Sequence, residues 1–407
     1  MYNFPDTLYP EPQKMFWDDS MCFGFPEGNT IFYSRYDGNW SDIGLWEAVN
    51  GSKRLPGAGD VVYVRHTVVA DVTASVKNLF VSGTLKAVGA PFVSVLGNFQ
   101  SVGVVDFSDS SIYLVLFGLN NSCGAFIKGN SSVVYAARGD QYVMNIPYYS
   151  LYISYEGVKY LTGNLYANYV GIGNSTPVSL YYPAKLNCGS FDVSIESLST
   201  DAGFSQSTGT LIKPTQGNIL FTGLINLGNS GRTTLDFYGN PNVECRGGIT
   251  AANFQSSTIK SGAGLWKFTT NSQSWTGGEG STFDAPILIS GAISLTLTGS
   301  GAFYQNAFNG QINGDNAGST FISGKLNVGY SAVTQPMQTG VLDCSSLPNV
   351  WKYNRFGGQE IKGTTYQTLE FGGSGVKKLM GNVTVLTAYS VTGTATVDLN
   401  GYTLTTP

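Results

Sequence analysis

The chain has 407 residues and a formal net charge of −4; 12% of its residues are charged, 42% are hydrophobic and 52 are glycine. This apolar content argues against disorder, because disordered chains combine few apolar residues with a high net charge. The acidic balance and the scattered Lys and Arg residues argue against nucleic-acid binding, which needs a basic surface for the phosphates.

The residue pattern predicts an all-β protein. Apolar residues alternate with period two between clusters of Gly, Asn, Ser and Asp, and the chain carries 24 Tyr and 23 Phe. Aromatic residues favour strands, and we find no stretch with apolar residues at helical spacing over three turns. Short strands separated by turns are therefore expected throughout.

The first 35 residues are rich in Pro and aromatic side chains and show little alternation. An exposed aromatic segment promotes aggregation, so this one is expected to pack on the protein itself or on a partner. We predict a docking arm or cap over residues 1–35 and a β-rod over residues 36–407. The side chains expected to dock are Phe4, Tyr9, Phe16, Trp17 and Phe23.

The start of the chain, "MYNFPDTLYPEPQKMFW", has no basic segment followed by an apolar one and no 18-residue apolar span. It predicts neither export nor membrane insertion, and hence a protein assembled in a cytoplasm. The cysteines are five, far apart and without a CxxC motif, which fits buried reduced thiols. They are Cys22, Cys123, Cys188, Cys245 and Cys344.

One unit of the sequence occurs twice. "PYYSLYISYEGVKYLTGNLYA" (147–167) aligns with "TTYQTLEFGGSGVKKLMGNVTV" (364–385) when Tyr148 is placed on Tyr366, an offset of 366 − 148 = 218 residues. Two short alternations separated by glycines suit a coil of a parallel β-helix, because glycine supplies the φ > 0 corners. Successive coils stack about 4.8 Å apart, and coils of about 20 residues would number about 17 over residues 60–404.

The alternation also predicts which side chains form the interior. The residues expected to point inward are Leu369, Phe371, Leu379, Val383 and Val385. The alternative fold is a row of small β-sandwiches, each needing antiparallel hairpins. The Asn-Gly and Asp-Gly turns typical of such hairpins are few, which favours the β-helix.

Two motifs resemble a known group of proteins. "GNWSDIGLWE…LPGAGDVVYV…VKNLFVSGTL" (38–88) and the repeated unit (148–169 and 366–404) resemble the right-handed parallel β-helix proteins of phage fibres and spikes and of bacterial adhesins. The resemblance implies a virion protein that contacts other virion proteins and a host-surface glycan or receptor. Many fibres of this kind are homotrimers, so the resemblance also suggests three subunits.

The sequence contains few of the residue combinations that catalysis requires. His66 is the single histidine, and the sequence shows no partner that would orient it as the base of a Ser-His-Asp or Cys-His set. One histidine is also too few for a His-rich metal site. Glycoside hydrolysis needs two carboxyl groups about 5–9.5 Å apart, and pairs near in sequence are expected by chance. The pairs are Glu279 with Asp284, Asp192 with Glu196 and Asp236 with Glu244, with Arg232 and Arg246 as a possible clamp. We predict no catalytic residue, metal or cofactor.

Outward aromatic residues are the better candidates for a site. If Leu151 and Ile153 point inward, Tyr148, Tyr152 and Tyr166 point outward, in the most tyrosine-dense stretch of the chain. Rigid amphipathic Tyr side chains suit protein interfaces and sugar stacking. The alternative is that several of them simply fill the interior.

The sequence is compatible with three functions. The preferred one is a non-enzymatic structural or adhesive virion protein, a phage tail or head fibre or spike that docks by its N-terminal arm. The second is a β-helical polysaccharide depolymerase, hydrolase or lyase, which needs a carboxylate cleft. The third is a bacterial surface adhesin, which needs an export signal.

Overall fold

The computed structural model describes residues 30–407 except 90, 174–182, 201–208, 228–233, 252–257, 277–281, 299–305, 324–325, 328–332 and 347–348. About 55% of it is strand. By its contacts the described chain divides into two compact units, one ending at Val133 and the other beginning at Val134. The five aromatic residues predicted to dock through the arm lie outside the described residues.

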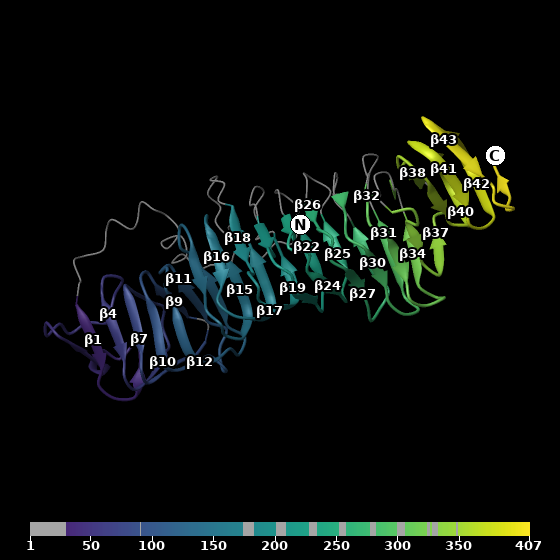
Figure 1. The fold of residues 1–407 in the computed structure, drawn as a ribbon. Helices are drawn as coiled ribbons and strands as arrows, with labels where there is room; N and C mark the ends of the chain where they lie inside the picture. The colour runs from purple at the N-terminus through teal and green to yellow at the C-terminus, as the bar shows by residue number, and fades with distance from the viewer. Residues whose placement is uncertain are drawn as a thin grey trace. The chain divides into compact units, whose positions relative to one another are not determined.

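The first unit is a stack of short strands in which strands of successive coils lie side by side (Figure 1). Its larger sheet has the order β2-β5-β8-β10-β7-β4-β1-β3 with β12 beside β10, and a second sheet contains β6, β9 and β11. The strands are β1 (Ile31–Ser34), β2 (Gly38–Asn39), β3 (Trp46–Ala48), β4 (Val61–Val64), β5 (Thr67–Ala70), β6 (Ala74–Val76), β7 (Asn78–Val81), β8 (Thr84–Ala87), β9 (Phe92–Val95), β10 (Phe99–Asp106), β11 (Tyr113–Leu116) and β12 (Ser122–Ile127).

The N-terminal coil carries its own cap. Strand β3 pairs with β1 in the antiparallel sense, and a single 3₁₀ turn, η3 (Ile43–Leu45), precedes it. Trp40 and Trp46 are buried, with ring centroids 4.8 Å apart. Because β1 also pairs in parallel with β4, the solenoid already begins inside the range predicted for the arm.

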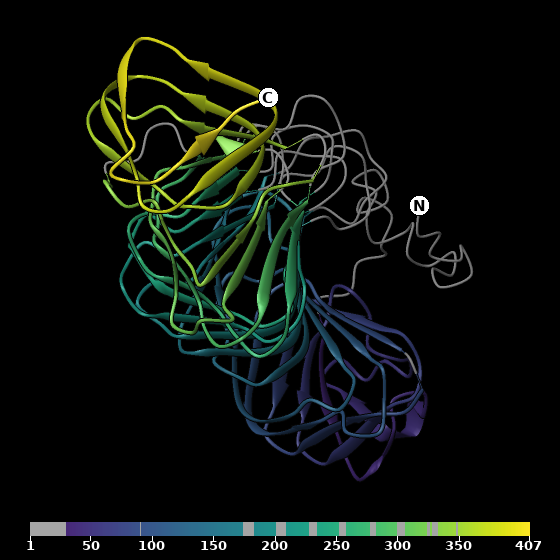
Figure 2. The ribbon, with the colours of Figure 1, turned by 90° about the vertical axis from the view of Figure 1, so that its right-hand side faces the viewer.

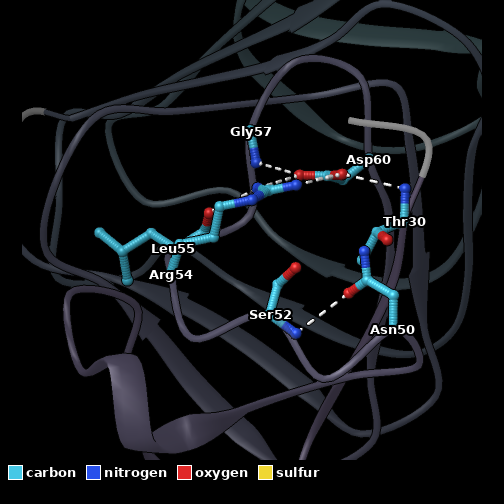
Figure 3. A network of polar contacts seen from close by, with 7 residues as sticks. All are labelled: Thr30, Asn50, Ser52, Arg54, Leu55, Gly57 and Asp60. Atoms are coloured by element: carbon cyan, nitrogen blue, oxygen red, sulfur yellow. Dashed lines mark hydrogen bonds and ion pairs between the residues drawn. The ribbon is translucent and has the colours of Figure 1, made fainter. Parts of the chain in front are cut away.

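A buried carboxylate fastens this first coil, as Figure 3 shows. Asp60 accepts hydrogen bonds from both guanidinium Nη atoms of Arg54, at 2.6 and 2.9 Å, and from the backbone N–H groups of Gly57 and Thr30, at 2.7 and 3.1 Å. Burial alone would raise the pKa of Asp60, but these donors outweigh it and hold the pKa below its ordinary value. The Pro-Gly turn of the sequence motif is thereby tied to the start of β4.

In the second unit most coils consist of three short strands, each stacked on its counterpart in the next coil. The first sheet contains β14 (Gln141–Val143), β16 (Val158–Leu161), β18 (Ala184–Asn187), β20 (Gly209–Ile212), β23 (Thr234–Asp236) and β26 (Thr258–Lys260). Two sheets towards the C-terminus contain β29 (Thr282–Phe283), β32 (Asn306–Phe308), β35 (Leu326–Asn327), β38 (Val350–Tyr353), β40 (Thr365–Phe371), β42 (Val383–Val391) and β44 (Leu404–Thr405), and then β39 (Gln359–Ile361), β41 (Ser374–Leu379) and β43 (Thr394–Asp398).

The remaining strands form one column from β13 through β15 and β17 to β19, and two neighbouring columns continue from β19, which pairs with both β21 and β22. The members are β13 (Ser132–Tyr135, which spans the boundary between the units), β15 (Tyr148–Ile153), β17 (Leu165–Ile172), β19 (Val193–Ser199), β21 (Asn218–Phe221), β22 (Ile225–Leu227), β24 (Asn242–Cys245), β25 (Ile249–Ala251), β27 (Trp266–Phe268), β28 (Gln273–Thr276), β30 (Ile287–Ile289), β31 (Ser294–Thr298), β33 (Ile312–Gly314), β34 (Thr320–Ser323), β36 (Met337–Gln338) and β37 (Val341–Asp343). One buried column of side chains follows the pairing register through Ile219, Val243, Trp266, Ile287, Ile312 and Met337.

The architecture is a parallel β-helix, as the sequence predicts. Apart from β1 with β3, the strand pairs described above run parallel, which rules out tandem β-sandwiches built from antiparallel hairpins. The coils number about 14 rather than about 17. The prediction was too high because coil length varies: Val62 pairs with Leu79, 17 positions on (79 − 62), whereas Leu165 pairs with Val193, 28 positions on (193 − 165).

The sequence repeat corresponds to two coils with the same interior. Buried tyrosine hydroxyls meet at 2.9 Å between Tyr135 and Tyr148, and at 3.0 Å between Tyr353 and Tyr366. The corresponding tyrosines of the two pairs are again 218 positions apart (353 − 135 and 366 − 148). All five residues predicted to line the interior of the second copy are buried, from Leu369 at 0% exposure to Val385 at 3%.

The last coil leaves its inner side chains partly uncovered. Figure 2 shows the C-terminal coils in yellow, each passing around an interior. Phe371 is fully buried, whereas Val391, stacked on it, is 43% exposed, and Leu399, the residue after β43, is 47% exposed. Within the described residues the interior thus ends in an open apolar layer.

Candidate functional site

The structure places the three tyrosines predicted to face outward in different environments. Tyr148 is only 1% exposed, so its predicted outward orientation is wrong. In β15 both Ser150 and Leu151 are buried, and this break in the alternation turns Tyr148 inward together with Leu151. Tyr166 is 58% exposed, as predicted, and Tyr152 is half-buried.

Two further tyrosines join Tyr152 and Tyr166 on the outer side of β15 and β17. Tyr149 is 39% exposed, and the ring of Tyr169 lies 5.5 Å from that of Tyr152 with the planes tilted by 49°. We call Tyr149, Tyr152, Tyr166 and Tyr169 the tyrosine face. A hydrogen bond of 2.7 Å from Asn168 Nδ2 to Glu196 Oε2 links β17, the strand of Tyr166 and Tyr169, to β19 in the next coil.

A second aromatic group lies on the outer side of β14 and β16. Tyr142 is 54% exposed and pairs in register with Tyr160, with ring centroids 6.1 Å apart and a tilt of 42°. Asp140 accepts a 3.4 Å hydrogen bond from the Tyr160 hydroxyl and one of 2.9 Å from Val158 N–H. Burial and the neighbouring Asp140 carboxylate raise the pKa of Tyr160. We call Asp140, Tyr142 and Tyr160 the Asp140 cluster.

The second copy of the coil lacks both groups. At the positions 218 residues further on, the tyrosine face has Gln367, Glu370, Thr384 and Thr387, and the Asp140 cluster has Gly358, Glu360 and Lys378. On this copy the outer residues include an ion pair of 2.7 Å between Glu370 and Lys352. Because both copies share their interior, the coil does not require outward tyrosines.

Both copies also bury a lysine at the corner of the coil. The Nζ atom of Lys159 donates to the carbonyl oxygens of Ala137, Gly139 and Glu156 at 2.7, 2.6 and 3.1 Å. Burial lowers the pKa of Lys159 to about 8, although the nearby carboxylates of Asp140 and Glu156 act in the opposite direction. Because all three N–H donors of the Lys159 ammonium group bind backbone oxygens, this cation has a structural role.

In the first unit three outward aromatic side chains cover one another. Tyr33, Tyr63 and Phe80 form a column with centroid distances of 5.1 and 4.8 Å and tilts of 24° and 14°. The guanidinium carbon of Arg65 lies 3.8 Å from the centroid of Tyr33. These ring faces are occupied by their neighbours, so the column stabilises the coils.

The carboxylates considered for catalysis make structural contacts. Asp192 accepts from Asn218 N–H at 3.0 Å, Asp284 accepts from Asn309 Nδ2, and Glu244 binds Arg246 at 2.8 Å. Glu279 and Arg232 lie outside the described residues. Within the described part of the chain, no three His, Cys, Asp or Glu side chains gather in a way that could hold a metal ion.

The lone histidine and the cysteines also have structural surroundings. His66 Nδ1 lies 2.8 Å from the carbonyl oxygen of Ser34 and 3.1 Å from its hydroxyl. Of the four described cysteines, all with free thiols, three are buried as predicted, whereas Cys123 is half-buried. Burial raises the pKa of the Cys123 thiol to about 11, so it is protonated at neutral pH.

Comparison of the chain with protein-family models, with curated proteins and with solved structures returns no match. Among the described residues, no helix is long and apolar enough to cross a membrane. The fold and the surface geometry therefore define the class: a parallel β-solenoid with a tyrosine-rich outer surface on two successive coils.

Proposed function

We propose that this protein is a non-enzymatic structural and adhesive component of a virus particle, a fibre or spike of the phage type. Its solenoid presents an outer surface to a host-surface glycan or receptor, and its N-terminal arm attaches it to other virion proteins. The resemblance of its opening and repeated motifs to such proteins supports the virion location and a homotrimeric state.

The observation that carries the adhesive role is the difference between the two copies of the repeated coil. Tyr152 and Tyr166 occupy outer positions where the second copy has Glu370 and Thr384. Outward tyrosines are not needed to build this coil, and exposed aromatic area is costly in solubility. Tyr side chains offer large, rigid contact surfaces to protein and sugar ligands.

The adhesive role is tested with purified protein and host cells or isolated host-surface polysaccharide. Replacing Tyr152 by Gln and Tyr166 by Thr, which keeps the size and polarity of the second copy, is expected to reduce binding at least tenfold. Tyr238, which is 59% exposed in a turn after β23, provides the matched control: Tyr238→Thr should bind like the unchanged protein. Equal binding by all three proteins would contradict the role.

Two further measurements address the rest of the proposal. Immunogold electron microscopy with antibodies against the solenoid is expected to label intact virus particles, and labelling of the host cell envelope alone would favour the bacterial adhesin. A reducing-end or unsaturated-sugar assay is expected to show no turnover of the bound polysaccharide. Sustained release of ends would favour the depolymerase.

A further inference from the structure

We propose that the Asp140 cluster is a binding site for one neutral hexose unit of a glycan, separate from the tyrosine face on β15 and β17. This inference rests on the proposed adhesive function and adds to it a second contact point and a preference among sugars. It follows from the ring geometry, the position of the carboxylate and the comparison of the two repeated coils.

The ring geometry leaves aromatic surface available. Tyr142 lies on β14, the edge strand of its sheet among the described residues, and its side chain is 54% exposed. Its centroid distance of 6.1 Å and tilt of 42° to Tyr160 are too large for full stacking. By contrast, Tyr63 and Phe80 stack at 4.8 Å and 14° and cover each other's faces. A pyranose ring can pack its C–H face against such an uncovered ring, because the π face carries partial negative charge.

The carboxylate supplies the polar part of the site. Asp140 is exposed, and its two oxygens receive one hydrogen bond each, from Tyr160 Oη and Val158 N–H. An ionised carboxylate offers about four acceptor sites, so room remains for sugar hydroxyl donors. Lys185, beside Val158 in the next coil, adds an outward donor.

The charge of the cluster selects against acidic sugars. The exposed carboxylates of Asp140, beside the rings, and of Glu156, at the turn before β16, outnumber the outward cation Lys185. The exposed Arg138 is directed to the ring of Tyr155. The buried Lys159 directs its ammonium hydrogens to carbonyl oxygens of the coil corner and so offers none to a ligand. A uronic or sialic acid unit would bring a like charge next to Asp140, which is unfavourable.

The second copy shows that the cluster is not part of the coil's scaffold. There Gly358, Glu360 and Lys378 take the places of Asp140, Tyr142 and Tyr160, while the buried lysine and the tyrosine pair are kept. Glu360 and Lys378 are neighbours in register, so the double replacement Tyr142→Glu and Tyr160→Lys reproduces a pairing that the chain already contains.

The experiment is a glycan array probed with the full chain, carrying neutral hexose oligosaccharides and matched oligosaccharides with uronic or sialic acid. We expect binding to neutral members, at least a tenfold loss of it in Tyr142→Glu/Tyr160→Lys, and a loss of about fivefold in Tyr142→Ala. Asp140→Asn removes the charge and is expected to raise binding of acidic members relative to neutral ones. Circular dichroism and thermal unfolding should match those of the unchanged protein.

Unchanged neutral-glycan binding in the double variant, or a preference of the unchanged protein for acidic glycans, would overturn the proposed site. If binding is lost in the Tyr152→Gln/Tyr166→Thr variant but kept in the Tyr142→Glu/Tyr160→Lys variant, the site is refuted while the adhesive function stands. If the double variant loses binding but the unchanged protein degrades the glycan, the site stands and the non-enzymatic function fails.

Discussion

The side chain of Lys377 reaches the corner of the preceding coil, where its Nζ atom lies 3.2 Å from Oε1 of Gln359. The same ammonium donates to the carbonyl oxygens of Arg355 and Gly357 at 2.9 and 3.2 Å. Lys159 makes the equivalent contacts in the first copy. Lys213, also fully buried, donates to the carbonyl oxygens of Gly189 and Phe191 at 3.0 and 2.6 Å. Within the described residues a buried lysine thus satisfies carbonyl acceptors of a coil at least three times.

Replacing Lys377 by Met is expected to destabilise the C-terminal coils by about 2–4 kcal/mol, because several buried acceptors lose their donor at once. Lys378, the next residue, points outward and provides the control: Lys378→Met should change the free energy of unfolding by less than about 0.5 kcal/mol. The stability of both variants is measured by denaturant unfolding, with hydrogen exchange of the β41 amides as the readout for the C-terminal coils. Equal stability of the two variants would show that the carbonyl groups find other partners.

Stability is also expected to rise with pH above about 8. Burial lowers the pKa of Lys159 and Lys377 to about 8, whereas an unfolded lysine titrates near about 10.4. Between these values the unfolded chain binds more protons than the folded one, so the free energy of unfolding increases with pH. The buried Tyr366 has a raised pKa and acts in the opposite direction above about pH 10.

The measurement is the melting temperature between pH 7 and pH 9.5, compared with the double variant Lys159→Met/Lys377→Met. The variant is expected to lose part of the rise seen in the unchanged protein, because burial also lowers the pKa of Lys213 and of Lys362. A rise of the same size in both proteins would assign the pH dependence to other groups.

The interior could be predicted because a strand alternates strictly between its two sides. That rule correctly placed Leu369 and Phe371, but it failed at Tyr148, where two consecutive residues of β15 turn inward. The break in the alternation at Ser150 and Leu151 depends on how this coil packs on the next one. The residues around a position do not show such packing, so the break could not be predicted from the sequence.

The buried lysines illustrate a second limit. Lys159 has the same parity as the buried Leu161, so the alternation itself points it inward. Lysines are usually exposed, however, and this rule predicts an outward side chain. The structure shows why Lys159 is buried: three carbonyl oxygens accept hydrogen bonds from its ammonium group. The Asp140 cluster was missed for a related reason: its members come from two successive coils, whose register the sequence alone does not set.

Replacing Asp60 by Asn is expected to loosen the N-terminal coil by about 3 kcal/mol, because the guanidinium of Arg54 loses its charged partner. Fluorescence of Trp40 and Trp46 during denaturation reports on this coil. Asp71→Asn is the control, since Asp71 binds only the exposed Ser41 in the described structure, and little change is expected.

Acid should have the same effect as this replacement. The pKa of Asp60 is lowered in the folded state, so its contribution is complete above the unfolded value near about 3.9 and is lost as the pH falls through the lower folded value. The Asp60→Asn variant is expected to show less acid-induced loss of tryptophan signal below about pH 4. An identical acid transition in both proteins would contradict the role of this carboxylate.

Gly157 is expected to tolerate no side chain. Its φ of +88° is left-handed, and a Cβ atom would lie 2.2 Å from the carbonyl carbon of Gly139 in the preceding coil. Gly291 has a similar φ of +92° but no heavy atom within 4 Å of the added position. We expect Gly291→Ala to cost about 1 kcal/mol from backbone strain, and Gly157→Ala about 3 kcal/mol or more because coil stacking is disturbed as well. Similar melting temperatures of the two variants would contradict the steric part.

The open C-terminal layer predicts a gradient of protection in the last coils. Strand β41 lies between β39 and β43, whereas β43 pairs with β41 and is the last strand of that sheet in the part of the chain that the structure describes. Leu379, the last residue of β41, is fully buried, whereas Leu399, the residue after β43, is 47% exposed. Backbone amides of β43 should therefore exchange with solvent at least tenfold faster than those of β41, because edge strands open at lower free energy. Exchange measured at several protein concentrations checks this: equal protection of both strands at every concentration would mean that the apolar layer is covered in solution.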